Sequence, residues 1–324
     1  MLRAATRGSA LARWQAAHVA DLLGDAIDVQ LLVVTTTGDR RAGEPISSIG
    51  GKGVFVKEVQ AAVLDGRADL AVHSAKDLPA TTPDGLVVAA VPPRADPRDA
   101  LVGSRLDDLP PKGLVATGSA RRRVQLRRLR PDLRFAELRG NIDTRLAKVP
   151  DYHAVIMAKA ALDRLGEHPS VVAALGRRGE QPSVVAALER LGEQPNVVDV
   201  LGRRREQPAI VDVLDCEVMV PQVGQGALAV ECREGDDRVR SLLAAIEDPM
   251  ARRAVDAERA FLSTLGGDCT LPAGAHARIL DNRVVMRAVL AGGVDGRCHT
   301  MVDEGSDGES LGQDLARRLL AAAR

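Results

Sequence analysis

Two groups of charged side chains in this 324-residue sequence could do chemistry. The first is a dense series of arginines: Arg121, Arg122, Arg123, Arg127, Arg128, Arg130, Arg134, Arg139 and Arg145. A guanidinium group binds a carboxylate or a phosphate through two parallel hydrogen bonds, so the series indicates a ligand with several anionic groups. The second is the pair Lys76-Asp77, which follows the apolar run DLAVH. A carboxylate kept ionised by nearby arginines could stabilise a transient cation, but by itself this pair is better interpreted as a surface ion pair or a helix N-cap.

The arginines differ in their predicted positions. Ser119 to Arg122 follows a strand pattern and opens a helix pattern, where backbone N–H groups add positive charge. Arg139 and Arg145 fall in the next strand-to-helix turn, and Arg7 falls in the equivalent turn near the N-terminus. These turn positions favour an anion site. A solvated helix face is the preferred interpretation of three others: Arg127, Arg128 and Arg130.

The four cysteines, Cys216, Cys232, Cys269 and Cys298, are far apart in the sequence. None belongs to a CxxC pair, so we predict no metal site and no disulfide framework. Cys269 lies in the glycine-flanked loop 266–274, where exposure and modification are as plausible as an inert buried thiol. The other three lie in or beside apolar segments and are predicted to be inert.

Composition narrows the class of protein. A net charge of zero and only 2% aromatic residues argue against nucleic acid binding, which needs basic surfaces and stacking rings. No apolar run reaches the roughly 20 residues of a membrane span. The N-terminal residues form no long apolar signal core. We therefore expect a cytoplasmic protein that binds neither nucleic acid nor membrane.

The elements that must position these residues alternate between strand and helix. Strands are predicted over 29–36, 69–73, 86–91, 113–117, 134–138 and 154–158, and helices over 9–23, 54–64, 119–130 and 144–148. This alternation predicts βαβ units with mostly parallel sheets, whose ligands bind beyond the carboxyl ends of the strands. Prolines at 92, 93 and 97 indicate a hinge between two similar α/β halves with a cleft between them.

The remaining sequence contains a repeat and a third unit. Glu167, Glu180, Glu193 and Glu206 begin four copies of a 13-residue unit at 167–218, each with a proline that suits a helix start. A surface expansion of short helices is preferred over a partner-binding solenoid. After a turn at 221–227 and a strand at 228–232, the pattern predicts a helix at 248–265, a hairpin at 278–290 turning at 281–282, a strand at 296–302 and a helix at 309–324. This indicates a small α+β domain.

Seven motifs in order carry a resemblance to a known family: ATRGSALA, GGKGVFVKE, DLAVHSAKDLP, ATGSARRR, LRGNIDTRL, VGQGAL and GGDCTLPAG. Together they closely resemble the porphobilinogen deaminases (hydroxymethylbilane synthases). The resemblance implies an α/β fold of two periplasmic-binding-protein-like lobes and a small α+β C-terminal domain. We place the first lobe at 1–92 with a return segment at 227–244, the second at 95–220, and the small domain at 249–324.

The resemblance also implies the chemistry. A dipyrromethane held on Cys269 through a thioether would accept four porphobilinogens, each losing ammonia, before hydrolysis releases hydroxymethylbilane. Asp77 would be the catalytic carboxylate, with Lys76 orienting anionic groups. The implied cofactor contacts further include Ser74, Thr117, Ser119, Arg121, Arg122, Arg139 and Gly140. The implied substrate contacts are Arg7, Ser9, Arg145, Arg164 and Gln225, and the implied lid residues are Lys52 and Phe55.

Two departures from the family pattern stand out. Asp268 precedes the cysteine where the family often has glycine, and a neighbouring carboxylate disfavours the thiolate. The family has about one repeat unit where this chain has four. Two other functions remain open from the residues: a non-enzymatic two-lobed binding protein for a small polycarboxylate, and RNA binding through the arginine series. The resemblance implies a monomer, with transfer of the product to the next pathway enzyme as a further possibility.

Overall fold

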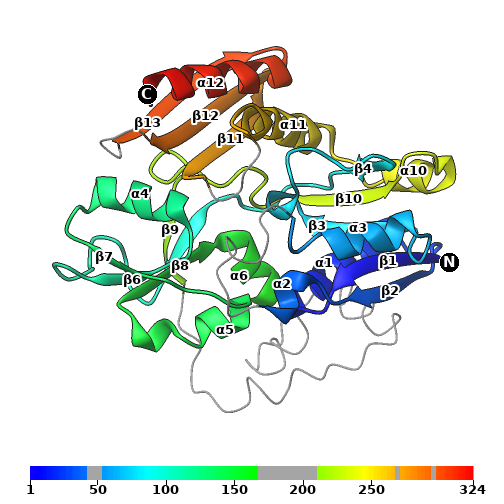
Figure 1. Cartoon of the computed structure of the whole chain (residues 1–324), viewed down its shortest axis with the longest axis horizontal. Coiled ribbons are helices and arrows are strands. Elements are labelled where there is room, and N and C mark those ends of the chain that lie inside the picture. Colours follow the sequence, from blue (N-terminus) through cyan, green and yellow to red (C-terminus); the bar gives the residue numbers. More distant parts are fainter. Residues whose placement is uncertain (42–52, 167–209, 267–270, 293–296, 324) are drawn as a thin grey trace.

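The structure is a computed structural model that describes residues 1–41, 53–166, 210–266, 271–292 and 297–323. Figure 1 shows two α/β lobes side by side and a smaller domain packed above them. The predicted architecture of two α/β lobes and a small α+β domain is confirmed. The predicted repeat helices over 167–209 and the loop residues 49–52 and 267–270 lie outside the described residues. The helix predicted for the fourth repeat copy, 206–218, is wrong, because its described part forms strand β9 (Ile210–Leu214) in the sheet of the second lobe.

The first lobe is built on a five-stranded sheet in the order β2-β1-β3-β10-β4. Its strands are β1 (Leu2–Arg7), β2 (Val29–Val34), β3 (Leu70–Ser74), β4 (Leu86–Ala90) and β10 (Leu228–Arg233). Its helices are α1 (Ala10–Leu23), α2 (Thr37–Arg40), α3 (Lys57–Leu64) and α10 (Asp237–Ala244), with the short 3-10 helix η2 (Ala75–Asp77) after β3. Buried Leu2, Leu70 and Leu228 pack in its core.

The second lobe has the strand order β7-β6-β8-β5-β9. Its strands are β5 (Asp99–Val102), β6 (Leu114–Ala116), β7 (Arg134–Ala136), β8 (Ala154–Ala158) and β9 (Ile210–Leu214). Its helices are α4 (Ala120–Leu129), α5 (Ile142–Leu146), η3 (Val149–Asp151) and α6 (Lys159–Gly166). Leu101, Leu126 and Ile156 are among its fully buried side chains.

The prediction of mostly parallel sheets is confirmed, with one strand in each lobe running against the others. In the first lobe, β1 runs parallel to β2 and β3, but β10 runs antiparallel to β3 and β4. In the second lobe, β5 runs antiparallel to both β8 and β9. Both β5 and β10 follow segments that cross between the lobes, so each enters its sheet from the opposite end to the local βαβ strands.

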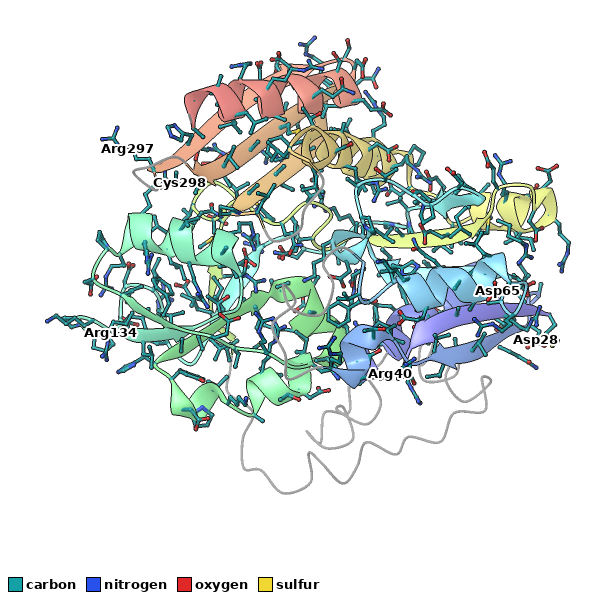
Figure 2. The ribbon with its side chains drawn as sticks, in the orientation of Figure 1. Asp28, Arg40, Asp65, Arg134, Arg297 and Cys298 are labelled. Carbon is teal, nitrogen blue, oxygen red and sulfur yellow. The ribbon has the colours of Figure 1, made fainter. Side chains whose placement is uncertain are left out.

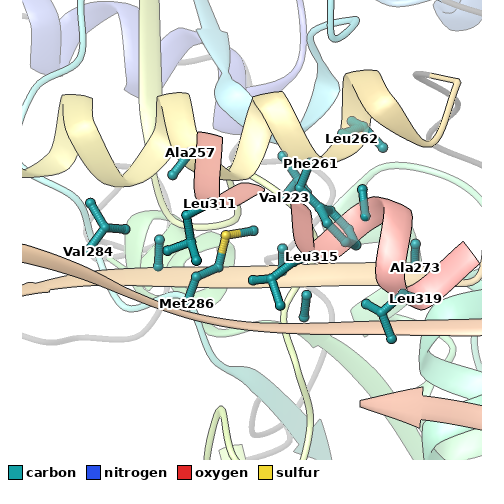
Figure 3. Close-up of a cluster of buried hydrophobic side chains, with 14 of the residues drawn as sticks. Val223, Ala257, Phe261, Leu262, Ala273, Val284, Met286, Leu311, Leu315 and Leu319 are labelled. Atoms are coloured by element: carbon teal, nitrogen blue, oxygen red, sulfur yellow. The ribbon is translucent and has the colours of Figure 1, made fainter. Parts of the chain in front are cut away.

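The C-terminal domain packs two helices on one antiparallel sheet. The order is β11 (Ala273–Leu280), β12 (Arg283–Gly292) and β13 (Arg297–Gly305), covered by α11 (Pro249–Thr264) and α12 (Gly308–Ala322). Figure 3 shows Phe261 of α11 and Leu315 of α12 meeting Met286 of β12 between these layers. The predicted hairpin turn is confirmed, because Asp281 and Asn282 both have positive φ (47° and 61°), as a two-residue type I′ turn requires.

The two segments that join the lobes touch each other. The Ala95 N–H donates to the Gly226 carbonyl at 3.2 Å. Gly226 has φ of 89°, and a Cβ atom there would lie 2.4 Å from the Ala95 carbonyl oxygen. Only glycine tolerates both the positive φ and this close contact. The VGQGA motif therefore holds together the two crossings, the segments that join the lobes.

Candidate active site

The turn that carries Lys76 and Asp77 is fixed by the loop 222–227. The Ala75 N–H donates to the Ala227 carbonyl at 3.0 Å, and the Gln222 side-chain amide donates to the Lys76 carbonyl at 3.2 Å. Gly224 lies so close to this turn that a Cβ atom on it would be 2.9 Å from the backbone nitrogen of Lys76. The turn at the carboxyl end of β3 is therefore held in place by the segment that returns from the second lobe.

Charged groups from both lobes surround Lys76. Burial, together with the positive charges of Arg122 and Arg145, lowers the pKa of Lys76 to about 8, while Asp77 and Asp99 oppose this shift. Burial and Arg122 also lower the pKa of Arg145 to about 10, and Asp77 again acts in the opposite sense. The charges of Asp77, Lys76, Arg122 and Arg145 therefore act on one another, and these four residues form one electrostatic cluster contributed by both lobes.

Within the described residues, the Asp77 carboxylate has no hydrogen bond and no ion pair, although it is partly buried. Lys76 likewise donates no side-chain hydrogen bond within that part of the chain. Arg145 uses one guanidinium nitrogen, Nε, to donate to the Gly140 carbonyl at 2.8 Å. The cluster therefore keeps acceptor and donor capacity for a ligand.

Asp99 holds the two arginines that open α4. Its Oδ2 lies 2.8 Å from Arg121 Nη1, and its Oδ1 accepts from Arg122 Nε and Nη2 at 2.9 and 2.8 Å. Burial alone would raise the pKa of Asp99, but the two guanidinium groups outweigh burial and hold it well below the usual range. Gln225 completes this cluster by donating to Asp99 Oδ1 at 3.0 Å and to the Pro97 carbonyl at 2.7 Å.

This arrangement refines two of the predicted site residues. Gln225 is fully buried with its amide engaged, so the structure places it behind Arg122 as a support. Arg121 is 3% exposed and points toward the C-terminal domain, where its Cδ would be 2.9 Å from a Cβ atom on Gly274. Arg121 Nε and Nη2 are buried and have no hydrogen-bond partner among the described residues.

The predicted hydroxyl ligands all have internal partners. Ser9 and Ser119 are the N-caps of α1 and α4, accepting from the backbone N–H groups of Ala12 and Arg122. The Thr117 hydroxyl accepts from the Ser119 N–H at 3.2 Å. The Ser74 hydroxyl accepts from the Gln15 amide at 2.8 Å. Two helix N-termini therefore carry predicted ligand residues, which adds favourable positive charge for an anion.

Arg7 and Arg139 each have a carboxylate neighbour within the chain. Arg7 pairs with Asp39, and its guanidinium carbon lies 4.4 Å from the centroid of the Phe55 ring. Burial alone would raise the pKa of Asp39, but hydrogen bonds from Arg7 and Thr36 lower it. Arg139 Nη2 lies 2.8 Å from Glu137 Oε1, beside the turn at Gly140, whose φ is 111°. A bound polyanion would share or replace these contacts.

Four contributors were not predicted from the sequence. Asp99 lies in a strand of only four residues behind a proline-rich segment, and Gln15 lies on a helix 59 positions from its partner Ser74. Glu258 of α11 accepts from Arg94 Nη1 at 2.6 Å and from the Gly224 N–H at 2.7 Å, which ties the C-terminal domain to both crossings. Asp39 pairs with Arg7. Asp99 stands between Arg98 and the apolar residues 100–102, so the sequence gives no clear sign that this carboxylate is buried.

Dipyrromethane fits the residues present. Each of its rings carries two carboxylates, and Arg121 has two guanidinium nitrogens without a partner among the described residues. The Cδ atom of Arg121 approaches Gly274, which is close in sequence to Cys269. Cys269, Asp268 and Lys52 themselves lie outside the described residues. In the described ranges, no group of three or more His, Cys, Asp or Glu side chains is arranged to hold a metal ion. The helices described there include none with the length and apolar character to cross a membrane.

Comparison with known proteins gives a consistent result. The family described as "Porphobilinogen deaminase, dipyromethane cofactor binding domain" matches residues 2–187 and 183–241, two segments that overlap inside the repeat. "Porphobilinogen deaminase, C-terminal domain" matches residues 252–321. The porphobilinogen deaminase of Roseiflexus castenholzii is 41% identical over 327 residues, covering 98% of this chain and 95% of that protein. That of Syntrophobacter fumaroxidans is 37% identical over 331 residues, covering 99% and 94%.

Among solved structures, the chain matches a periplasmic His/Glu/Gln/Arg/opine family-binding protein from Silicibacter pomeroyi at 14% identity and a TM-score of 0.34, covering 76% of this chain and 89% of that one. The sequence matches reach from residue 2 to residue 321 and include both lobes and the small domain. The chain therefore belongs to the porphobilinogen deaminase family, the transferases of porphyrin biosynthesis, and carries that family's dipyrromethane cofactor binding domain.

Proposed function

We propose that this protein condenses four porphobilinogen molecules head to tail on a covalently held dipyrromethane and releases hydroxymethylbilane by hydrolysis (EC 2.5.1.61). One observation carries the proposal: the Asp77 carboxylate, which has no hydrogen bond or ion pair among the described residues, lies in one electrostatic cluster with Lys76, Arg122 and Arg145, contributed by both lobes. A binding protein for a polycarboxylate needs the cations but has no use for this carboxylate.

The cationic and the anionic side chains of the site have different roles. Each porphobilinogen ring carries an acetate and a propionate, which Lys76, Arg145 and Arg139 would bind as charge-assisted hydrogen bonds. Loss of ammonia leaves a cation shared between the methylene carbon and the pyrrole nitrogen. Asp77 would stabilise this cation and accept a hydrogen bond from the pyrrole N–H. When bound, dipyrromethane would supply the nucleophilic carbon that starts the chain.

Cys269 is the best candidate for the thioether because the other thiols are poor nucleophiles. Burial raises the pKa of Cys216 and of Cys232 to about 11, and it also raises the pKa of Cys298. Figure 2 shows Cys298 at the start of β13, at the edge of the C-terminal domain above α4. At neutral pH these three thiols are protonated, whereas attachment needs a thiolate or its equivalent.

Intact-protein mass spectrometry combined with a turnover assay tests the proposal. We expect the purified protein to exceed its sequence mass by one dipyrromethane and to release hydroxymethylbilane from porphobilinogen. Cys269→Ser should have the sequence mass and no turnover, whereas the matched control Cys298→Ser should keep both the added mass and activity. An unmodified wild-type mass with tight porphobilinogen binding and no product would instead favour the binding protein.

The deprotonation of Lys76 should be visible in the pH dependence of kcat/KM. Because its pKa is about 8, Lys76 is a cation below that pH and becomes neutral above it. We therefore expect kcat/KM for porphobilinogen, which reports the free enzyme, to fall as pH rises through about 8. Lys76→Arg keeps the positive charge and should move this fall in kcat/KM, the alkaline limb of the profile, to higher pH. A profile that is identical in wild type and Lys76→Arg would remove Lys76 from substrate binding.

We further propose that the enzyme acts as a cytoplasmic monomer that transfers its product to the next enzyme of the pathway. The resemblance to the family, which implies a monomer, supports this. Light scattering on the active holoenzyme should give the mass of one chain, and a dimer at assay concentration would contradict the proposal.

A further inference from the structure

The two lobes also meet through an aromatic contact that the reaction outlined above does not use. Trp14 and His18, one turn apart on α1, stack with ring centroids 4.9 Å apart and an interplanar angle of 12°. Arg164 of α6, in the other lobe, lies with its guanidinium carbon 5.7 Å from the centroid of the Trp14 ring. Helices α1 and α6 pack against each other, as Figure 1 shows near the centre of the molecule.

Two of the contacts of Arg164 bear on its position. Its Nη2 donates to the Gly226 carbonyl at 2.7 Å, in the crossing segment that also contacts Ala95. The indole face of Trp14 supplies the second contact. Arg164 is 7% exposed and Trp14 is 4% exposed, so the cation–π attraction acts with little solvent screening. A ring from the opposite lobe therefore contributes to the position of this guanidinium.

A purely space-filling role does not explain tryptophan at this position. The Trp14 indole N–H is buried and has no hydrogen-bond partner among the described residues, which is unfavourable. Phenylalanine would fill much of the same space without that donor. Tryptophan has the advantage that its ring gives the strongest cation–π attraction of the aromatic side chains.

His18 contributes a neutral ring next to a fixed cation. Burial, and then the positive charge of Arg164, lower the pKa of His18, while Asp21 on the same helix opposes them. At neutral pH the stack is therefore uncharged. Protonation of His18 would place a second cation beside Arg164 and weaken its hold on the platform.

We propose that Trp14 and His18 form an aromatic platform that positions Arg164 across the lobe junction to receive a substrate carboxylate. The role of Arg164 in this inference rests on the proposed function. Trp14 and His18 are positioning residues, since they act through Arg164 and need not touch the substrate.

Trp14→Phe separates positioning from packing. We expect KM for porphobilinogen to rise about three- to tenfold, the range of a weakened cation–π contact, with kcat within about twofold of wild type. The melting temperature should hold or rise because the orphaned N–H is gone. The matched control is Phe135→Leu, which removes the cation–π contact of Arg127 in the second lobe and should leave KM unchanged. An unchanged KM with a lower melting temperature in Trp14→Phe would overturn the proposal.

A second test uses no substrate, so it stands even if porphobilinogen is not turned over. Trp14 is the only tryptophan in the chain, and a protonated imidazole stacked on it should quench its fluorescence. The quenching midpoint of wild type should lie below pH 6.5. Arg164→Gln should raise the midpoint and Asp21→Asn should lower it, while His18→Phe should abolish the titration. Equal midpoints in wild type, Arg164→Gln and Asp21→Asn would show that Arg164 is not held against this stack.

Discussion

Replacing Asp77 with asparagine should lower kcat for porphobilinogen about 100- to 1,000-fold, the usual loss when one charge-stabilising group is removed from an active site. The amide has the shape of the carboxylate but no negative charge, so the cation formed as ammonia leaves would face only Lys76, Arg122 and Arg145. KM should change little, because the groups that bind the ring carboxylates remain. Steady-state release of hydroxymethylbilane measures the effect.

Two controls make this result specific. Asp65→Asn removes a carboxylate from the outer end of the first lobe, where Figure 2 places Asp65, and should keep wild-type kcat. Asp77 also raises the pKa of Lys76, so its loss should move the alkaline limb of kcat/KM to lower pH than about 8. If Asp77→Asn retained kcat within about threefold, the carboxylate would have no catalytic role and the proposed division of work would be wrong.

Local patterns predicted those parts of the fold that depend on near neighbours. The short buried run that becomes β3 and the turn that follows it are local features, and so is the two-residue turn at Asp281 and Asn282. The direction of β5 and β10 in their sheets is not local, because it is set by segments that cross between lobes. Periodicity along the chain does not encode this direction.

The same distinction applies to the site. Motif positions identified Arg121 and Arg122, since both residues open a helix after a strand. They did not reveal that the two arginines share one buried carboxylate, or that Arg121 faces the C-terminal domain. Asp99 is 23 positions from Arg122 and pairs with it only once β5 lies beside β8. A partner fixed by sheet order leaves no spacing signal in one sequence.

Asp99→Asn should lower the free energy of unfolding by about 3–5 kcal/mol, because it leaves two buried guanidinium groups without their counter-charge. Chemical denaturation at pH 7 measures this. Asp132→Asn, which breaks an exposed pair with Arg130, is the control and should leave the unfolding midpoint unchanged. An Asp99→Asn protein as stable as wild type would mean that the arginines do not depend on this carboxylate.

The pH dependence of the same variant tests the cause. The pKa of Asp99 is depressed in the folded protein, so its stabilisation is complete above the unfolded value of about 4 and is lost as pH falls through the lower folded value. The stability difference between wild type and Asp99→Asn should therefore shrink below about pH 4. Because Asp99 also aims Arg122 at the lobe junction, the variant should raise KM at neutral pH. Asp77→Asn should change kcat and leave the stability unchanged. The two variants therefore distinguish a carboxylate that acts on the reaction from a carboxylate that holds the binding groups in place.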